Sequence, residues 1–349
     1  MLSSHAITIP FPGVIGTFMG RDALRLAVSA LGLAPSDVAL LPAYLCVEVL
    51  KPFLANCRVE FYDVGRDTAI DPAELERLLI RHQPKVVLFI NYFGFLQPAR
   101  AQIKNLCIRH GARLIEDCAH SLLTEGSGAT GDWIIHSFRK ILPLPDGGGL
   151  KVNNGSELPH PRFRPRIYAD LLSLLIVIKS AVKVKSTTFS RAGLTSRAKL
   201  LAGTPCSPVE IPRLLPMSIF ARRRMRRLDF AVVTARRRDD FQFWLEWSTQ
   251  TEGVTPLFDR LPPGVCPMGF PALVRNREGV KSLLERRGLL VRTHWHLPES
   301  VGGEFVNSRW LAGQSLTMPL YPEFNAADRD RVSGVLRKSS EPGNGQGGC

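Results

Sequence analysis

The chain has 349 residues, a length that predicts one large domain and a smaller one. Hydrophobic residues make up 45% and charged residues 22%, which is the ordinary composition of a globular protein. The formal net charge is +14, and the excess lies between Arg162 and Arg238, so it marks one region and not the whole surface.

The cysteines and the apolar segments predict the compartment. The seven cysteines are scattered, odd in number and never form a C-x-x-C pair, which excludes a disulfide framework and a zinc ribbon and favours a reducing environment. The N-terminus lacks the basic region and the long apolar core of a signal peptide. The longest apolar run, Leu171–Ile178, is too short for a bilayer, which needs about 20 residues. We therefore expect a cytoplasmic protein without a transmembrane segment.

Strands and helices alternate along the first third of the chain. Residues 1–15, with two prolines, are expected to form an extended arm. After it, apolar runs predict strands, and apolar residues at helical spacing predict helices. The Asp-Pro-Ala-Glu sequence at Asp71 has the cap, the proline and the glutamate of a helix start. This order predicts a mostly parallel sheet covered by helices. The expected elements are a helix from Gly20, strand Val38–Leu41, a helix to about Leu54, strand Val59–Val64, a helix from Asp71, strand Val86–Ile90 and a helix over about Ala99–His110.

The residues of chemical interest lie in Arg113–Leu150. A strand at Arg113–Ile115 is followed directly by Glu116 and Asp117, and a strand at Trp133–Phe138 is followed by Lys140 and a turn rich in proline and glycine. Ligands of open α/β sheets bind at the carboxyl ends of the strands. An acid at one strand end and a lysine just past another suit an enzyme that uses pyridoxal phosphate (PLP), because the lysine can bind the cofactor covalently and the acid can pair with its ring nitrogen.

The second half of the chain departs from this rhythm. Residues 155–216 are rich in proline, arginine and serine and contain one apolar helix, about Tyr168–Val184. We predict one long helix over Phe220–Trp247 with Met225, Leu228, Val232 and Ala235 on one face, then strands Phe270–Val274 and Leu289–Arg292, a helix at Arg277–Arg287 and a last helix from about Ala326. The expected division is an N-terminal arm at 1–15, a large domain at 16–216 with a basic insert at about 155–216, a helix and small C-terminal α+β domain at 217–337, and a disordered tail at 338–349.

The order of these motifs resembles the fold-type I PLP enzymes, and among them the DegT/DnrJ/StrS family of nucleotide-sugar aminotransferases. The resemblance is good from about Gly20 to Leu150, fades over residues 155–215 and returns loosely from Met217 to Tyr321. The segments that carry it are Gly20-Arg21-Asp22-Ala23-Leu24, Asn91-Tyr92-Phe93-Gly94, Glu116-Asp117-Cys118-Ala119-His120, Ser137-Phe138-Arg139-Lys140 and Asp146-Gly147-Gly148.

The resemblance implies a role for each matching residue. Gly20 would open the helix whose N-terminus binds the cofactor phosphate, with Arg21 in place of the family's small hydroxyl residue, and Ser137 would touch the same phosphate. Asp117 would bind the ring nitrogen, His120 would lie near the phenolic oxygen, and Lys140 would hold the cofactor covalently. The place of the stacking aromatic falls on Cys46, which leaves Tyr44 as the candidate for that task. The Ser137-to-Lys140 spacing is shorter than the family's pattern.

The resemblance also implies a function. It predicts a fold-type I α/β protein that transfers an amino group from an amino-acid donor to a ketone on a nucleotide-linked sugar, in polysaccharide or glycoconjugate biosynthesis. It implies a homodimer with shared active sites. The alternative is a non-catalytic or altered-reaction member of the same fold that binds a sugar or a protein partner.

Two further patterns have competing interpretations. His294 and His296 could be metal ligands on one strand, but no cysteine or third histidine stands nearby at metal-site spacing, so we interpret the pair as structural or substrate-side and expect no metal site. Eight arginines between Arg222 and Arg238 could form a solvated face, or contact a substrate diphosphate or a second subunit. Nucleic-acid binding is not expected, since the sequence shows neither a nucleic-acid-binding fold nor interleaved aromatics.

Overall fold

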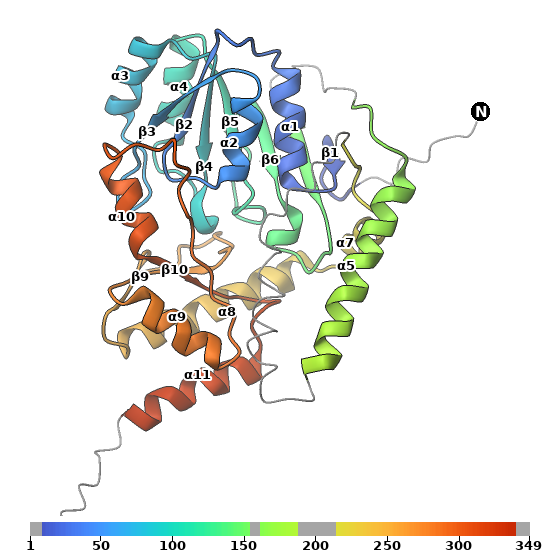
Figure 1. Cartoon of the computed structure of the whole chain (residues 1–349), viewed down its shortest axis with the longest axis vertical. Coiled ribbons are helices and arrows are strands. Elements are labelled where there is room, and N and C mark those ends of the chain that lie inside the picture. Colours follow the sequence, from blue (N-terminus) through green and yellow to red (C-terminus); the bar gives the residue numbers. More distant parts are fainter. Residues whose placement is uncertain (1–8, 154–160, 188–213, 340–349) are drawn as a thin grey trace, which may run out of the picture.

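The computed structural model describes residues 9–153, 161–187 and 214–339, which form two β-sheets with helices packed around them (Figure 1). The larger sheet has seven strands in the order β1-β7-β6-β5-β4-β2-β3. Strands β2 to β6 are mutually parallel, while β7 runs antiparallel to both of its neighbours. The predicted fold class, an α/β protein with a mostly parallel central sheet, is confirmed. The strands are β1 (Val14–Thr17), β2 (Val38–Pro42), β3 (Arg58–Tyr62), β4 (Val86–Ile90), β5 (Arg113–Asp117), β6 (Trp133–His136) and β7 (Gly148–Val152).

The central strands form because their apolar runs are covered on both faces. All five residues of β4 are buried, as the continuous run Val86–Ile90 predicted. The helix start at Asp71 is also confirmed, since the Asp71 side chain accepts a hydrogen bond of 2.9 Å from the amide of Ala73. The helices that connect these strands are α1 (Gly20–Ala30), α2 (Val47–Leu54), α3 (Pro72–His82) and α4 (Arg100–Arg109).

The extended arm at 1–15 stays a prediction, and the structure shows that its described end packs against the protein. Strand β1 begins at Val14 and pairs with β7, and Ile9 is buried in the core, while residues 1–8 lie outside the described part of the chain. The glycines predicted to form a tight turn belong mainly to β7. A Cβ atom on Gly148 would collide with the backbone of Met19, so glycine at this position lets the start of α1 lie directly on the strand.

A smaller antiparallel sheet has three strands in the order β10-β9-β8. Its core contains Phe241, Trp244, Phe270 and Phe324. The strand predicted at Leu289–Arg292 is wrong: Arg292 forms only an isolated bridge with Thr317, and the residues before it are buried without a ladder. The elements of this part are α8 (Phe230–Thr249), β8 (Val254–Pro256), β9 (Phe270–Val274), α9 (Arg277–Arg286), α10 (Val306–Gln314), β10 (Ser315–Met318) and α11 (Ala326–Ser339).

The single long helix predicted over Phe220–Trp247 is wrong. The chain forms α7 (Ile219–Met225) and then α8, because the Asp229 carboxylate accepts hydrogen bonds from the amides of Ala231 and Val232 and starts a new helix. The predicted apolar face is also wrong for α8, since Val232 is 46% exposed. The residues of α8 that are buried include Val233, Arg237, Phe241 and Trp244, which recur at helical spacing.

Helix α5 (Arg166–Thr187) lies within the basic insert and stands along one side of the molecule beside α7 (Figure 1). It confirms the apolar helix predicted over about Tyr168–Val184. Among the described residues, no helix is both long and apolar enough to cross a membrane. Met217 and Ala221 pack into the core of the larger sheet, and the division of the chain into domains at residue 216 stays a prediction. Helix α11 extends into the predicted tail, whose residues 340–349 lie outside the described part.

Candidate active site

The predicted acid and lysine lie at one edge of the larger sheet. Asp117 is the last residue of β5, which pairs in parallel with β6, and Lys140 ends the short 3-10 helix η2 (Phe138–Lys140) that follows β6. The amide of Lys140 donates to the carbonyl of Ser137 at 3.2 Å. Despite the short spacing between Ser137 and Lys140, this tight turn leaves the lysine side chain close to the residues that follow β5, since its Nζ atom lies 2.9 Å from His120 Nε2.

Asp117 is a buried carboxylate close to the lysine. Only 6% of its surface is exposed, and one carboxylate oxygen accepts a hydrogen bond of 2.8 Å from the amide of Ala119. Burial raises the pKa of Asp117, while the positive charge of Lys140 and the hydrogen bond from Ala119 act in the opposite direction. The two residues that the sequence paired are therefore electrostatically coupled at the same site.

His120 joins the pair. Its Nε2 atom lies 2.9 Å from Lys140 Nζ, and its Nδ1 atom accepts a hydrogen bond of 3.3 Å from the amide of Phe93. Burial and the nearby Lys140 lower the pKa of His120 well below its ordinary value, so the imidazole is neutral. A neutral ring that accepts at Nδ1 carries its proton on Nε2, the atom that faces the lysine.

The protein around Lys140 favours its neutral amine. Burial by the surrounding groups lowers the pKa of Lys140; Asp117 and Cys46 oppose this shift, and the charges of Arg139 and Arg292 add to it. The residue is nevertheless accessible to solvent because it lines an open pocket. Cys46, at the position expected for a stacking aromatic, is thus close enough to interact with the lysine.

An aromatic wall borders these residues. The ring of Tyr44 is fully buried, 5.4 Å from that of Tyr92 and 5.0 Å from that of Trp295, and tilted against both. Its hydroxyl donates to the carbonyl of His294 and lies 3.0 Å from Ser315 Oγ. Tyr44 therefore lies beside the site, but its hydroxyl is engaged by the smaller sheet.

Trp295 is a site residue that sequence reasoning missed. Its ring stacks on His120 at 5.5 Å and on Phe93 at 6.3 Å, although it lies far along the chain from both. The only signal was its place between His294 and His296. His294 Nδ1 lies 2.8 Å from Thr317 Oγ1, and burial with the charges of Arg292 and Lys140 lowers the pKa of His294 to about 3. His294 is thus a neutral histidine next to the lysine, as the substrate-side interpretation of the pair allowed.

The N-terminus of α1 meets Ser137. A Cβ atom on Gly20 would lie 2.9 Å from Ser137 Cβ, so only glycine lets the first turn approach the serine this closely. The first amides of a helix have no partner within the helix and attract anions. Arg21 does not lie free beside them, because its guanidinium pairs with Glu48 at 3.4 Å.

Glu116 has a different role from its neighbour Asp117. It is fully buried, and its two oxygens accept hydrogen bonds from the Asn91 side chain and from the amides of Gly128, Thr130 and Gly131. Glu116 therefore fixes the loop before β6. Asp146, the acid of the predicted Asp-Gly-Gly motif, is likewise structural, since its carboxylate accepts from the amide and the hydroxyl of Ser218 at the start of α7.

We expect Glu116→Gln to destabilise the fold by about 2–4 kcal/mol, because each carboxylate oxygen now accepts two hydrogen bonds. The NH2 group of glutamine would replace one of these oxygens and face two N–H donors, for example those of Thr130 and Gly131. Urea unfolding monitored by circular dichroism measures this loss. Glu125→Gln, a nearby change of the same kind for which no such set of side-chain bonds exists in the described chain, is the control. Equal stability of Glu116→Gln and the wild type would contradict the structural role.

The pocket beside Lys140 opens toward the smaller sheet. Its walls include Arg139, Arg292, Thr317, Met318 and Glu323. Arg237, fully buried in α8, donates to four backbone carbonyls around this pocket, those of Pro267, Met268, Ile141 and Tyr321. It therefore ties η2 to the smaller sheet.

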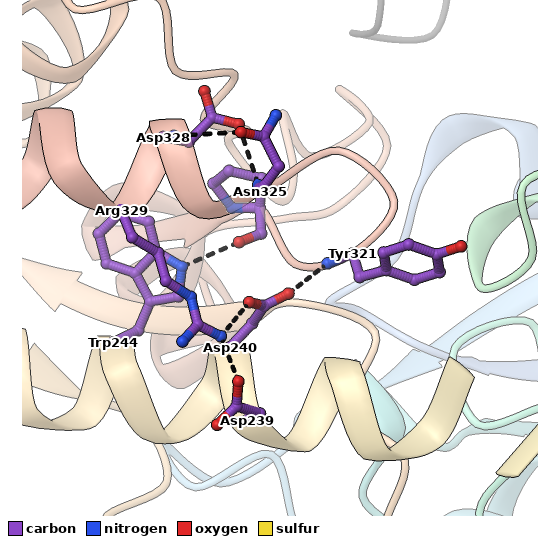
Figure 2. Close-up of polar contacts among 8 residues, drawn as sticks. Asp239, Asp240, Trp244, Tyr321, Asn325, Asp328 and Arg329 are labelled. Atoms are coloured by element: carbon purple, nitrogen blue, oxygen red, sulfur yellow. Dashed lines mark hydrogen bonds and ion pairs between the residues drawn. The ribbon is translucent and has the colours of Figure 1, made fainter. Parts of the chain in front are cut away.

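A second set of polar contacts fixes the wall that follows β10 (Figure 2). Asp240 on α8 accepts a hydrogen bond of 2.7 Å from the amide of Tyr321 and pairs with Arg329 on α11 at 2.6 Å. Arg329 also pairs with Asp239, and Trp244 donates to the carbonyl of Pro319 at 2.9 Å. Helix α8 thus holds the segment between β10 and α11 through its contacts with Pro319 and Tyr321, and Arg329 links α8 to α11.

Comparison with known proteins agrees with the predicted resemblance. Residues 12–160 match the model of the DegT/DnrJ/EryC1/StrS aminotransferase family. The chain is 30% identical over 143 residues to a UDP-4-amino-4,6-dideoxy-N-acetyl-beta-L-altrosamine transaminase of Campylobacter jejuni, a match that covers 39% of this chain and 38% of the relative. It is 31% identical over 152 residues to a UDP-N-acetyl-3-dehydro-alpha-D-glucosamine 3-aminotransferase of Acidithiobacillus ferrooxidans, covering 41% of each. The chain thus spans about two-fifths of the length of these curated relatives.

The fold extends further than the sequence match. A sugar aminotransferase structure from Streptococcus pneumoniae, solved in a PLP form, superposes with a TM-score of 0.66 at 15% identity and covers 95% of this chain and 87% of that one. At this identity the likeness establishes the fold and not the reaction. The predicted resemblance is confirmed, in the sequence from residue 12 to 160 and in the fold over nearly the whole chain.

Proposed function

We propose, from the family match over residues 12–160 and the shared fold, that this protein is a PLP-dependent aminotransferase acting on a nucleotide-linked ketosugar. The amino group would come from an amino acid, and the product would serve polysaccharide or glycoconjugate biosynthesis. We also propose that the enzyme acts in the cytoplasm as a homodimer. The main observation behind the proposal is that Asp117, His120 and Lys140 lie together at the carboxyl ends of β5 and β6.

The residues present fit the cofactor. A buried carboxylate suits a protonated ring nitrogen, a lysine with a lowered pKa suits covalent attachment to an aldehyde, and a helix N-terminus beside Ser137 suits a phosphate. Gly20 supports the last assignment, because a side chain there would fill the space next to Ser137. Arg21 fits less well than expected, since it pairs with Glu48, and we assign the phosphate contact at this position to its backbone.

PLP, when bound, withdraws electrons from the carbon that exchanges the amino group. Asp117 would accept a hydrogen bond from the ring N–H, keep the proton on the ring nitrogen and hold the ring in its orientation. His120 would donate a hydrogen bond from its Nε2–H group to the phenolic oxygen. Lys140, whose pKa is lowered by burial, would carry the proton that moves between carbon atoms through its Nζ atom. Tyr44 and Trp295 would exclude water from one side of this space.

The test is a loading and turnover experiment with the purified full chain. We expect PLP to produce a visible absorption band, and borohydride to fix the cofactor on a peptide that contains Lys140. With glutamate and a panel of nucleotide ketosugars, the loaded protein should form 2-oxoglutarate. A protein that takes up no PLP would contradict the proposal and favour a non-catalytic member of the fold, whereas a loaded protein that is inactive on the whole panel would contradict the substrate class.

A further inference from the structure

The outward side of α5 is an apolar surface of unusual size. From Ile167 to Ile178, eight large apolar side chains are each at least 36% exposed, and they are more than half of all such side chains in the described residues. Leu175, at 60%, and Leu171, at 52%, are the most exposed leucines of the helix. Exposed apolar residues scattered singly are normal, but a continuous apolar surface marks a place of interaction.

The helix is fastened to the protein along one narrow line. Ala169 and Ser173 are fully buried, Ser173 Oγ lies within hydrogen-bond distance, 3.2 Å, of Ser218 Oγ, and the Asp170 carboxylate accepts a hydrogen bond of 2.7 Å from the amide of Ile219. These contacts join α5 to the start of α7 and turn the remaining circumference outward (Figure 1). The apolar surface is therefore held rigidly on the outside of the molecule.

Positive charge surrounds this surface. Arg162 and Lys179 flank its two ends and are exposed. Helix α7, which packs on α5, has no acidic residue and carries exposed arginines at 223 and 224, followed by Arg227. The only acid in α5 is Asp170, which is already engaged by the backbone of α7. The surface thus combines apolar side chains with a cationic border.

The apolar side chains and the cationic border together indicate which partner binds this surface of α5. A second copy of the chain, packed by two-fold symmetry, would place the arginines and lysines of one border against those of the other, which is unfavourable. An anionic bilayer offers both an apolar interior for the leucines and phosphate groups for the cations. We propose that α5 binds the surface of an anionic phospholipid membrane, lying in the interface without crossing it. This inference does not depend on the proposed reaction.

The test is sedimentation of the full chain with vesicles. We expect binding to mixed phosphatidylcholine–phosphatidylglycerol vesicles to exceed binding to phosphatidylcholine alone by at least about tenfold, and to weaken as salt is added. Leu175→Asp should reduce binding to the mixed vesicles by a similar factor. The matched control is Ile108→Asp on α4, where the side chain is 63% exposed and the change in charge is the same; its binding should equal that of the wild type.

Several outcomes would overturn the inference. Binding that ignores phosphatidylglycerol, or that survives Leu175→Asp, would exclude this surface as the anchor. Failure of the wild type to sediment would exclude the membrane. If Leu175→Asp instead splits a larger assembly into single chains in light scattering, while the wild type ignores vesicles, then a second copy covers α5. Thermal melts of both aspartate variants exclude misfolding as the cause, since neither residue is in the core.

Discussion

Replacing Lys140 with alanine should abolish transamination, by at least about 10³-fold, while the protein stays folded. The loss is expected because Lys140 has two tasks, covalent attachment of the cofactor and proton transfer at Nζ, and no other lysine lines the pocket in the described chain. The side chain is accessible, and its Nζ atom lies within ion-pair distance of no carboxylate among the described residues, so its removal costs little stability. Turnover of 2-oxoglutarate and the visible band are the measurements.

The control is Lys85→Ala. Lys85 pairs with Asp37 at 3.0 Å just before β4, at the edge of the sheet opposite to the site, and its loss should leave both readouts unchanged. Circular dichroism establishes that each variant is folded. Turnover that survived in Lys140→Ala would show that the amine of this residue is not the reacting group, whatever the cofactor content.

Much of the larger sheet could be predicted from the sequence, because the parallel strands carry short apolar runs and an α-helix follows β2, β3 and β4. Val86–Ile90 is the clearest case, since burial on both faces leaves no polar position in the strand. The edge strand β1 and the glycine-containing strand β7 were missed. In β7, three of the five residues of Gly148–Val152 are two glycines and a lysine, so the segment has no apolar pattern typical of a strand. Their pairing depends on a contact between distant segments.

The sequence predicted the site residues that directly follow a strand. It missed those that come from a distant part of the chain. Glu116 and Asp117 are adjacent and equally acidic, and the side chains of successive strand residues point to opposite faces, so they lie in different surroundings. The local sequence does not indicate whether Glu116 or Asp117 points toward the lysine. The family resemblance predicted that it is Asp117. Trp295 enters from the smaller part of the fold, and no local pattern encodes that approach.

Asp117→Asn is the second change with a large expected effect. It should lower the rate of amino transfer by about 10²–10³-fold while PLP still attaches to Lys140. An amide of nearly the same size fits the site and can keep the bond from Ala119, but it carries no negative charge to hold a proton on the ring nitrogen. Single-turnover kinetics with glutamate, followed at the visible band, separate this step from cofactor loading.

Asp132→Asn supplies a change of equal charge away from the site. Asp132 is as buried as Asp117, pairs with Lys104 and accepts from the amide of Leu114 at the opposite end of β5. Asp132→Asn should lower the stability of the fold and leave the single-turnover rate intact. Asp117→Asn should lower the single-turnover rate and change the stability less. If both variants slowed the reaction equally, the slower rate of Asp117→Asn would come from the loss of a buried charge in the fold and not from a contact with the cofactor. A slow step confined to Asp117→Asn, with normal loading, requires that its carboxylate acts on the bound ring.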